Sequence, residues 1–184
     1  WLNECYTELN NIFTSFDGSM LISAVMAIIN DSTGLMHYYN AEHPFPVLLR
    51  DGSASFISNE IDVHKIGSLG FDEELQVKTC QLKPNDIIII GSDGRDDIEL
   101  GEDPRTGQRI INEDDILFLK NVEIGKGEIK KIVEIITQLG QITDDLSLIR
   151  IEYIKNSEQV THPSLHYKAK SILAQLSNKN DEHL

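Results

Sequence analysis

The sequence has few cysteines, and they form no pattern that would bind zinc or build a disulfide framework. Its two cysteines, Cys5 and Cys80, lie far apart, and neither belongs to a CxxC pair. Disulfide-stabilised secreted domains and structural zinc sites need more cysteines at closer spacing. The sequence therefore predicts a reduced, intracellular protein, which we expect in the cytoplasm.

Long hydrophobic runs and positive charge are also scarce. No apolar stretch reaches the roughly 18 residues that a membrane helix needs, and the chain opens without the basic start of a signal peptide. The 16 Lys and Arg residues against 30 Asp and Glu residues give a formal net charge of -14. This excess of acid argues against a general nucleic-acid binder and against contact with anionic membranes. Phosphate chemistry on such a surface would need metal ions to offset the charge.

The length of 184 residues suits one packed domain with a small appendage. Strand and helix patterns fill residues 1–154, after which the composition becomes polar and a short helical pattern follows. We therefore predict one domain over 1–154 and a helical tail or linker over 155–184. Because the chain begins with Trp1 and not with Met, we also expect it to be a piece of a longer protein.

The strand patterns indicate an α+β fold with antiparallel strands. The runs "SMLISAVMAIIN" and "LMHYYNA" are joined by the turn sequence "DSTG", and "VLLR" and "ASFIS" by "DGS", so each pair is predicted to form a hairpin with no helix between its strands. Strand pairs of this kind favour a sheet or sandwich over a parallel βαβ fold. Apolar residues at helical spacing predict helices over 1–16, in "EDDILFLKNV" and in "GEIKKIVEIITQLG". The charged stretch 95–112 is predicted to be a long, mobile loop.

Acidic residues stand at the ends of two predicted strands. Asp93 follows the apolar run "IIIIGS", and Asp144 precedes the run "LSLIRI". If both strands are central and adjacent, their carboxylates converge at one edge of the sheet, where they suit Mg²⁺ or Mn²⁺. An ordinary Asp-Gly turn and a solvated Asp pair are the alternatives, and by spacing alone they are the commoner ones.

Four stretches make the sequence resemble a known family. They are, in order, "MLISAVMAIINDSTGLMHYYNAEHPFPVLLR", "KIGSLGF", "LKPNDIIIIGSDGRDD" and "QITDDLSLIRI". Together they resemble the metal-dependent Ser/Thr phosphatases of the protein phosphatase 2C superfamily. Within it, the sequence is most similar to the bacterial branch of stage II sporulation protein E and the sigma-factor regulatory phosphatases.

The resemblance implies a β-sandwich flanked by helices, with two Mn²⁺ or Mg²⁺ ions in the cleft between the sheets. Asp93 matches the metal aspartate of the family's Ser/Thr-Asp-Gly motif, and Asp144 matches the first acid of its Asp-Asp motif. Two such ions activate a water for attack on phosphorus, so we expect no catalytic nucleophile from the protein. The implied partner is a phosphoserine or phosphothreonine protein, in this branch often an anti-sigma antagonist.

The roles of several neighbouring residues stay open. His43 is either a catalytic acid or, more commonly for such a His beside proline, a structural residue. Asp96 and Asp97 either assist the metals or line a mobile flap, and Asp145 points outward or forms a hydrogen bond. Glu42 stands where the family usually has Gly, and because Glu does not readily adopt a positive φ we expect a different local turn.

One family motif is missing from the sequence. The first metal motif, a Gly-Asp pair followed by an aromatic residue and another Asp, does not occur. We therefore expect that the N-terminal strands are missing by truncation, that the chain alone binds metal weakly, and that it has little or no activity. A self-associated partner is one candidate to cover the missing strands.

Two other functions remain to be weighed. In the first, the chain is a phosphatase-like regulatory or protein-interaction module without catalysis, and the absence of the motif is genuine. In the second, it is a calcium-binding β module, which is disfavoured because no loop has the alternating acids of a calcium loop.

Overall fold

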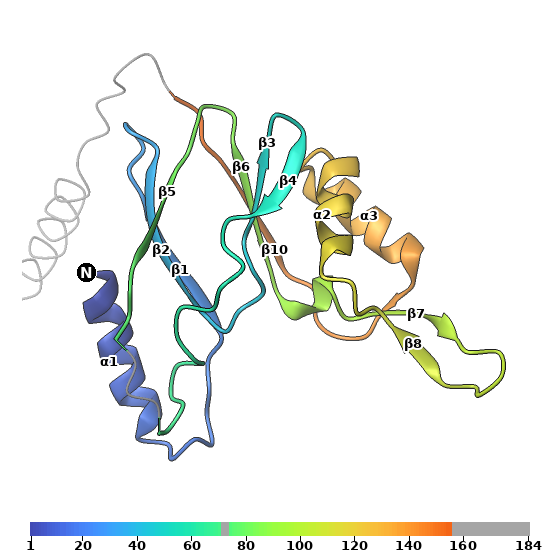
Figure 1. Ribbon diagram of the computed structural model, residues 1–184, viewed down its shortest axis with the longest axis horizontal. Coiled ribbons are helices and arrows are strands. Elements are labelled where there is room, and N and C mark those ends of the chain that lie inside the picture. Colours follow the sequence, from blue (N-terminus) through green and yellow to red (C-terminus); the bar gives the residue numbers. More distant parts are fainter. Residues whose placement is uncertain (71–73, 156–184) are drawn as a thin grey trace, which may run out of the picture.

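The computed structural model describes residues 1–70 and 74–155, and it arranges them in layers of helix and antiparallel sheet (Figure 1). The predicted tail over 155–184 lies outside the described residues, except for Lys155. Among the described helices, none has both the length and the apolar character needed to cross a membrane.

The first sheet has the strand order β1-β2-β5 and is covered on its outer face by helix α1. Its elements are α1 (Leu2–Thr14), β1 (Ala24–Ile29), β2 (Leu35–Ala41) and β5 (Lys78–Gln81). Strands β1 and β2 form the predicted hairpin, with Ala24 opposite Ala41 and Ile29 opposite Met36. Leu2 of the helix packs on Tyr39 and Ala41, which are fully buried.

The second sheet has the order β10-β6-β3-β4, and two helices cover its outer face. Its elements are β3 (Val47–Arg50), β4 (Ser53–Phe56), β6 (Ile87–Gly91), α2 (Ile116–Ile124), α3 (Ile129–Leu139) and β10 (Leu148–Glu152). Strand β6 carries the isoleucine run. Ile89 packs toward α2 and α3, whereas Ile88 packs toward the first sheet. The run is apolar without alternation because both of its faces are buried.

The two sheets pack face to face. Met36 and Tyr38 of the first sheet share a buried cluster with Leu48 and Ile88 of the second, and Tyr153 closes it. The resulting order of layers is helix, sheet, sheet, helix (Figure 1). This confirms the predicted α+β fold, an antiparallel sandwich flanked by helices.

A third, small sheet replaces the loop predicted over 95–112, so that prediction was wrong. It has the order β8-β7-β9 and follows a short 3₁₀ helix, η1. The elements are η1 (Asp93–Arg95), β7 (Ile98–Glu102), β8 (Arg109–Ile111) and β9 (Gln141–Ile142). Ile98 of β7 is buried in the core and Ile142 of β9 packs against it, and a β-bulge interrupts the pairing of β7 with β8. The sequence of this sheet therefore lacks the usual strand alternation of apolar and polar residues.

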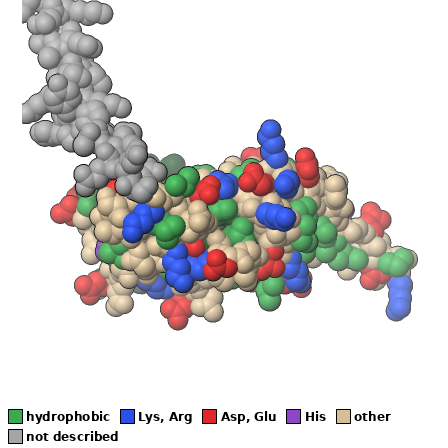
Figure 2. Space-filling view, turned by 90° about the horizontal axis from the view of Figure 1, so that it is seen from above, with side chains coloured by type: hydrophobic (Ala, Val, Ile, Leu, Met, Phe, Trp, Pro, Cys, Tyr) green, Lys and Arg blue, Asp and Glu red, His purple; other side chains and the backbone are tan. Residues whose placement is uncertain are grey.

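The hairpin of β7 and β8 projects from the body of the protein, and Figure 2 shows hydrophobic side chains along it. Leu100, Ile110 and Ile111 are all exposed. This exposure explains why the stretch carries little of the patterning that packing imposes on the other strands.

The turn at Glu42 also differs from expectation. Glu42 has a φ of 42°, so the positive φ of the turn is kept although the residue is not glycine. Its carboxylate accepts a hydrogen bond from the backbone N–H of Lys65 at 3.2 Å. On the next turn the side chain of Asn40 bonds both the N–H and the C=O of His43, at 2.7 and 2.8 Å. These bonds offset the roughly 1 kcal/mol that the left-handed conformation costs a non-glycine residue.

A buried ion pair ties β3 to the turn before β6. Arg50 donates from Nη2 and Nε to the Asp86 carboxylate at 2.6 and 2.9 Å, and the Lys83 N–H donates to it at 2.7 Å. The Asp86 side chain is only 3% exposed. Burial by itself raises the pKa of Asp86, but the hydrogen bonds from Arg50 and Lys83 lower it by more, so the net pKa lies below the usual value.

We expect Asp86→Asn to lower the free energy of unfolding at pH 7 by about 2 kcal/mol, because a charged hydrogen-bond acceptor of Arg50 is lost. A depressed folded-state pKa means that this stabilisation is present above the unfolded pKa of about 4 and is lost as the pH falls through the folded value. Urea unfolding at pH 7 and pH 3 measures both. An equal difference between the two proteins at both pH values would contradict the assignment.

Candidate metal centre

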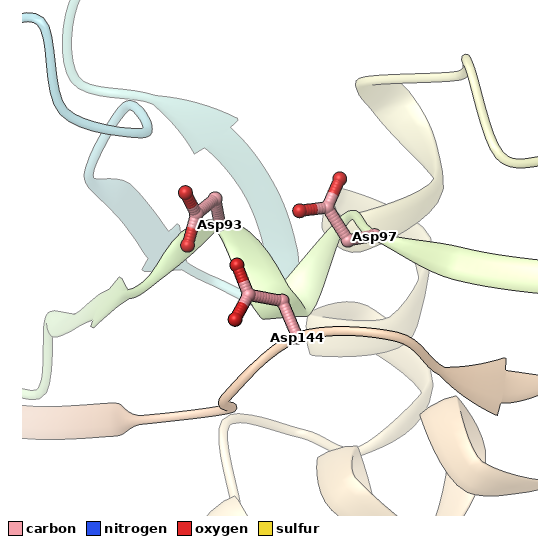
Figure 3. Close-up of side chains that lie close together, drawn as sticks. All are labelled: Asp93, Asp97 and Asp144. Atoms are coloured by element: carbon pink, nitrogen blue, oxygen red, sulfur yellow. The ribbon is translucent and has the colours of Figure 1, made fainter.

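Three aspartates meet beyond the end of strand β6 (Figure 3). Asp93 opens η1 directly after the strand, Asp97 precedes β7, and Asp144 lies between β9 and β10. One carboxylate oxygen of each lies within 4.8 Å of the other two. The two residues predicted from the sequence, Asp93 and Asp144, are therefore together, and Asp97 joins them.

The antiparallel pairing of β6 with β10 brings two of these acids to the same place. Gly91 pairs with Leu148, so the chain after β6 and the chain before β10 leave the sheet side by side. Ser92 then fastens them. Its hydroxyl donates to the carbonyl oxygen of Asp145 at 2.7 Å and accepts from the Ser147 N–H at 2.9 Å, while its own N–H donates to the Ser147 carbonyl oxygen at 2.9 Å.

Gly94 is required by close approach and not by a positive φ. A Cβ atom at this position would lie 2.6 Å from the carbonyl oxygen of Asp145 and 3.0 Å from that of Asp144. Any larger residue would push the loop of Asp144 away from the turn of Asp93. The glycine of the "SDG" motif thus sets the distance between the two acids.

Asp97 is held by backbone bonds on two sides. Its N–H donates to the carbonyl oxygen of Asp93 at 3.1 Å. Its own carbonyl oxygen accepts from both the N–H and the hydroxyl of Thr143, each at 3.0 Å. Ser92 and Thr143 are therefore positioning residues that the sequence analysis missed, although both lie next to the acid motifs.

The three carboxylates repel one another. The pKa of Asp97 is raised by burial first, and then by the negative charges of Asp93 and Asp144. Asp97 is half-buried and the other two are exposed. Oxygen donors at this spacing, with charge that a cation would neutralise, fit Mg²⁺ or Mn²⁺.

The neighbouring acids have other surroundings. The Asp96 carboxylate accepts from Nε of Arg95 at 3.0 Å, and burial raises its pKa. Of the two residues that the sequence left open, Asp97 therefore joins the cluster and Asp96 pairs with arginine. Asp145 is exposed, and its carboxylate lies outside the cluster.

A hollow of about 530 Å³ adjoins Asp93 and is also lined by His43, Phe45, Phe56 and Lys65. The Nδ1 atom of His43 lies 3.1 Å from the carbonyl oxygen of Pro44. A carbonyl oxygen can only accept, so this contact is a hydrogen bond in the tautomer that carries a proton on Nδ1. The bonds from Asn40 and to Pro44 account for a structural role of His43, and its position in the hollow leaves a catalytic role open.

A sequence model of the stage II sporulation protein E family matches residues 2–154. Comparison with curated protein sequences gives no match.

Several solved structures share the fold. The RsbU and RsbW domains of Rv1364c from Mycobacterium tuberculosis superpose with a TM-score of 0.63 at 18% identity, over 99% of this chain and 51% of that one. The SiaA-PP2C domain of Pseudomonas aeruginosa gives 0.63 at 13% identity, over 80% and 59%. The catalytic domain of the serine/threonine phosphatase PstP, in complex with two manganese ions, gives 0.51 at 13% identity, over 79% and 66%; PstP is also an M. tuberculosis protein. This chain thus spans about half the length of the first of these structures.

We expect Asp97→Asn to stabilise the metal-free chain at pH 7, by up to about 1 kcal/mol, because it removes one of three repelling charges. A raised folded-state pKa means that ionisation of Asp97 destabilises the fold as the pH rises above the usual aspartate value of about 4. The difference should therefore vanish at pH 3. Urea unfolding in the presence of EDTA at the two pH values is the measurement, and a destabilised variant at pH 7 would refute the repulsion.

Proposed function

This chain belongs to the stage II sporulation protein E family and has the fold of the protein phosphatase 2C-like domains, and we propose that it acts as a metal-dependent protein phosphatase on phosphoserine or phosphothreonine. The observation that carries the proposal is the convergence of Asp93, Asp97 and Asp144 at the end of the β6–β10 pair. A carboxylate cluster of this kind has no evident structural use, because its members repel one another.

The three aspartates would hold Mn²⁺ or Mg²⁺ through their carboxylate oxygens. Bound divalent ions supply a Lewis acid for the phosphoryl oxygens and make a water molecule more acidic. The manganese ions of the PstP catalytic domain support this choice of metal.

Other residues of the chain hold the three aspartates in place or line the neighbouring hollow. Ser92 and Gly94 keep Asp144 beside Asp93, and Thr143 keeps Asp97 in place. The hollow next to Asp93 offers Lys65 as a cation and Phe45 and Phe56 as apolar contacts for the residues around the phosphorylated side chain. In this proposal no residue of the described chain acts as a nucleophile.

The proposed substrate is a phosphoprotein, and an anti-sigma antagonist is the specific candidate that the family resemblance implies. One similar structure contains RsbU and RsbW domains of a single protein, which supports a regulatory role within a longer chain. We place this activity in the cytoplasm. Self-association remains a prediction.

A non-catalytic regulatory module is the second candidate. It is favoured by one observation, namely that the Gly-Asp-aromatic metal motif does not occur in the 184 residues. If that motif belongs to the parent protein, the enzyme is the better explanation, and the 184 residues alone would have little activity because part of the metal ligand set is missing.

We expect Asp93→Asn to abolish measurable Mn²⁺ binding while leaving the fold intact, because it removes one charge and one oxygen ligand from the cluster. Isothermal titration with Mn²⁺ and circular dichroism measure the two properties. Asp145→Asn is the matched control, since it removes the same charge from an exposed neighbour outside the cluster. Equal loss in both variants would mean that net charge and not coordination governs binding.

The activity itself is tested by Mn²⁺-dependent hydrolysis of para-nitrophenyl phosphate, and of a phosphoserine protein, with this chain and with one extended upstream. We expect the longer chain to be at least tenfold more active and to lose that activity with Asp93→Asn. Robust turnover by the 184 residues would remove the proposed dependence on an upstream motif. No turnover of either substrate by the longer chain would favour the regulatory module.

A further inference from the structure

A buried arginine lies inside the turn that carries the acid cluster. Arg95 stands between Asp93 and Asp97, and its side chain is only 2% exposed. Its guanidinium carbon lies 4.4 Å from the centre of the Phe118 ring on helix α2, which is within cation–π range. On its other side, Nε donates to the Asp96 carboxylate at 3.0 Å.

This arginine is an unusual choice for a buried position. Its Nη1 atom has no hydrogen-bond partner within the described part of the chain, and an unsatisfied buried donor is costly. An aliphatic residue would avoid that cost. We attribute the presence of arginine at this position to its two contacts, with the Phe118 ring on α2 and with the carboxylate of Asp96.

The contact adds a side-chain link between the turn and helix α2, next to the hydrogen bond that Asn112 donates to the carbonyl oxygen of Asp96 at 3.0 Å. Phe118 is fully buried under the second sheet with Val122, Ile132 and Ile136, so the ring is a fixed point. The Arg95 stem also fills the space above Gly91, where a Cβ atom would lie 3.1 Å from Cδ. The short helix η1 is thereby held between strand β6 and helix α2.

We propose that Arg95 is a positioning residue that couples helix α2 to the acid cluster and thereby sets the affinity of the cluster for divalent metal. The proposal rests on the proposed function in one respect, that Asp93, Asp97 and Asp144 bind metal. It adds that a partner which displaces α2 would change metal affinity without touching the acids.

Simple electrostatics predicts the opposite change in metal affinity when Arg95 is replaced. Arg95 is a positive charge beside three carboxylates, so its removal by Arg95→Met would strengthen cation binding if charge alone mattered. A positioning role predicts weaker binding, because η1 is released. Arg95→Lys separates the two further: it keeps the charge but loses the planar group that stacks on the ring.

The experiment is titration of the 184-residue chain with Mn²⁺, at a temperature where circular dichroism shows every variant folded. We expect Arg95→Met, Arg95→Lys and Phe118→Leu each to raise the Kd for Mn²⁺ about tenfold, as loss of a group that orients a ligand does. The double variant Arg95→Met with Phe118→Leu should bind no more weakly than Arg95→Met alone, since both remove one contact. Val122→Ala is the control, because it weakens the same helix without touching Arg95.

Unchanged or tighter binding by Arg95→Met would overturn the proposal, and so would an equal loss in Val122→Ala. A second measurement, on the metal-free chain, accompanies the titration. The backbone amide resonances of Asp93 and Asp97 should shift in Arg95→Met and Phe118→Leu but stay in place in Val122→Ala. If the unchanged chain binds no Mn²⁺, the three acids do not bind metal in the 184 residues alone, and the amide shifts still decide whether α2 is coupled to the cluster through Arg95.

Discussion

The burial of strand β6 on both faces is the constraint on which the rest of the structure depends. Ile88 lies against the first sheet and Ile89 against the helices, so the strand cannot slide or rotate without exposing apolar surface on one side. Because the strand is fixed, the position at which the chain leaves it after Gly91 is fixed as well. Strand β10, paired along the whole of β6, brings the loop of Asp144 to the same end.

At that end the chain holds together groups that repel. Ser92, Gly94 and Thr143 hold three backbone segments close together, and the carboxylates of Asp93, Asp97 and Asp144 lie next to one another as a result. The pKa of Asp97 is raised by burial first and then by the negative charges of Asp93 and Asp144, and the second cause is a cost of this arrangement. Structural cores do not need such a cost, whereas a site that binds cations does.

The same turn shows that the proposed metal centre depends on residues other than its three acids. Arg95 touches none of the three carboxylates through a hydrogen bond found in the described residues, yet it fills the turn that carries two of them. Through Arg95 and Phe118 the turn packs on helix α2, and through Ser92 it is hydrogen-bonded to the loop that leads into β10. The acids are therefore placed by two layers of the protein at once, which links the chemistry of the site to the packing of the fold.

The sequence by itself determined much of this protein. The hairpin of β1 and β2, the buried strand β6 and the helices over 116–124 and 129–139 followed from apolar periodicity. The convergence of Asp93 with Asp144 was expected from the order of the motifs and from the family resemblance that they carry. These features were readable because packing imposes a regular pattern wherever a face is buried.

Other features were decided only by the tertiary structure. The hairpin of β7 and β8 is exposed and carries no pattern, the choice of Asp97 over Asp96 depends on the rotation of one short 3₁₀ turn, and Glu42 keeps a positive φ because Lys65 and Asn40 bond its turn. The turn at Glu42 and the turn of η1 make contacts with residues distant in the chain, Lys65 and Phe118, which local composition does not record. The exposed hairpin lacks the packing that would leave a pattern in its sequence.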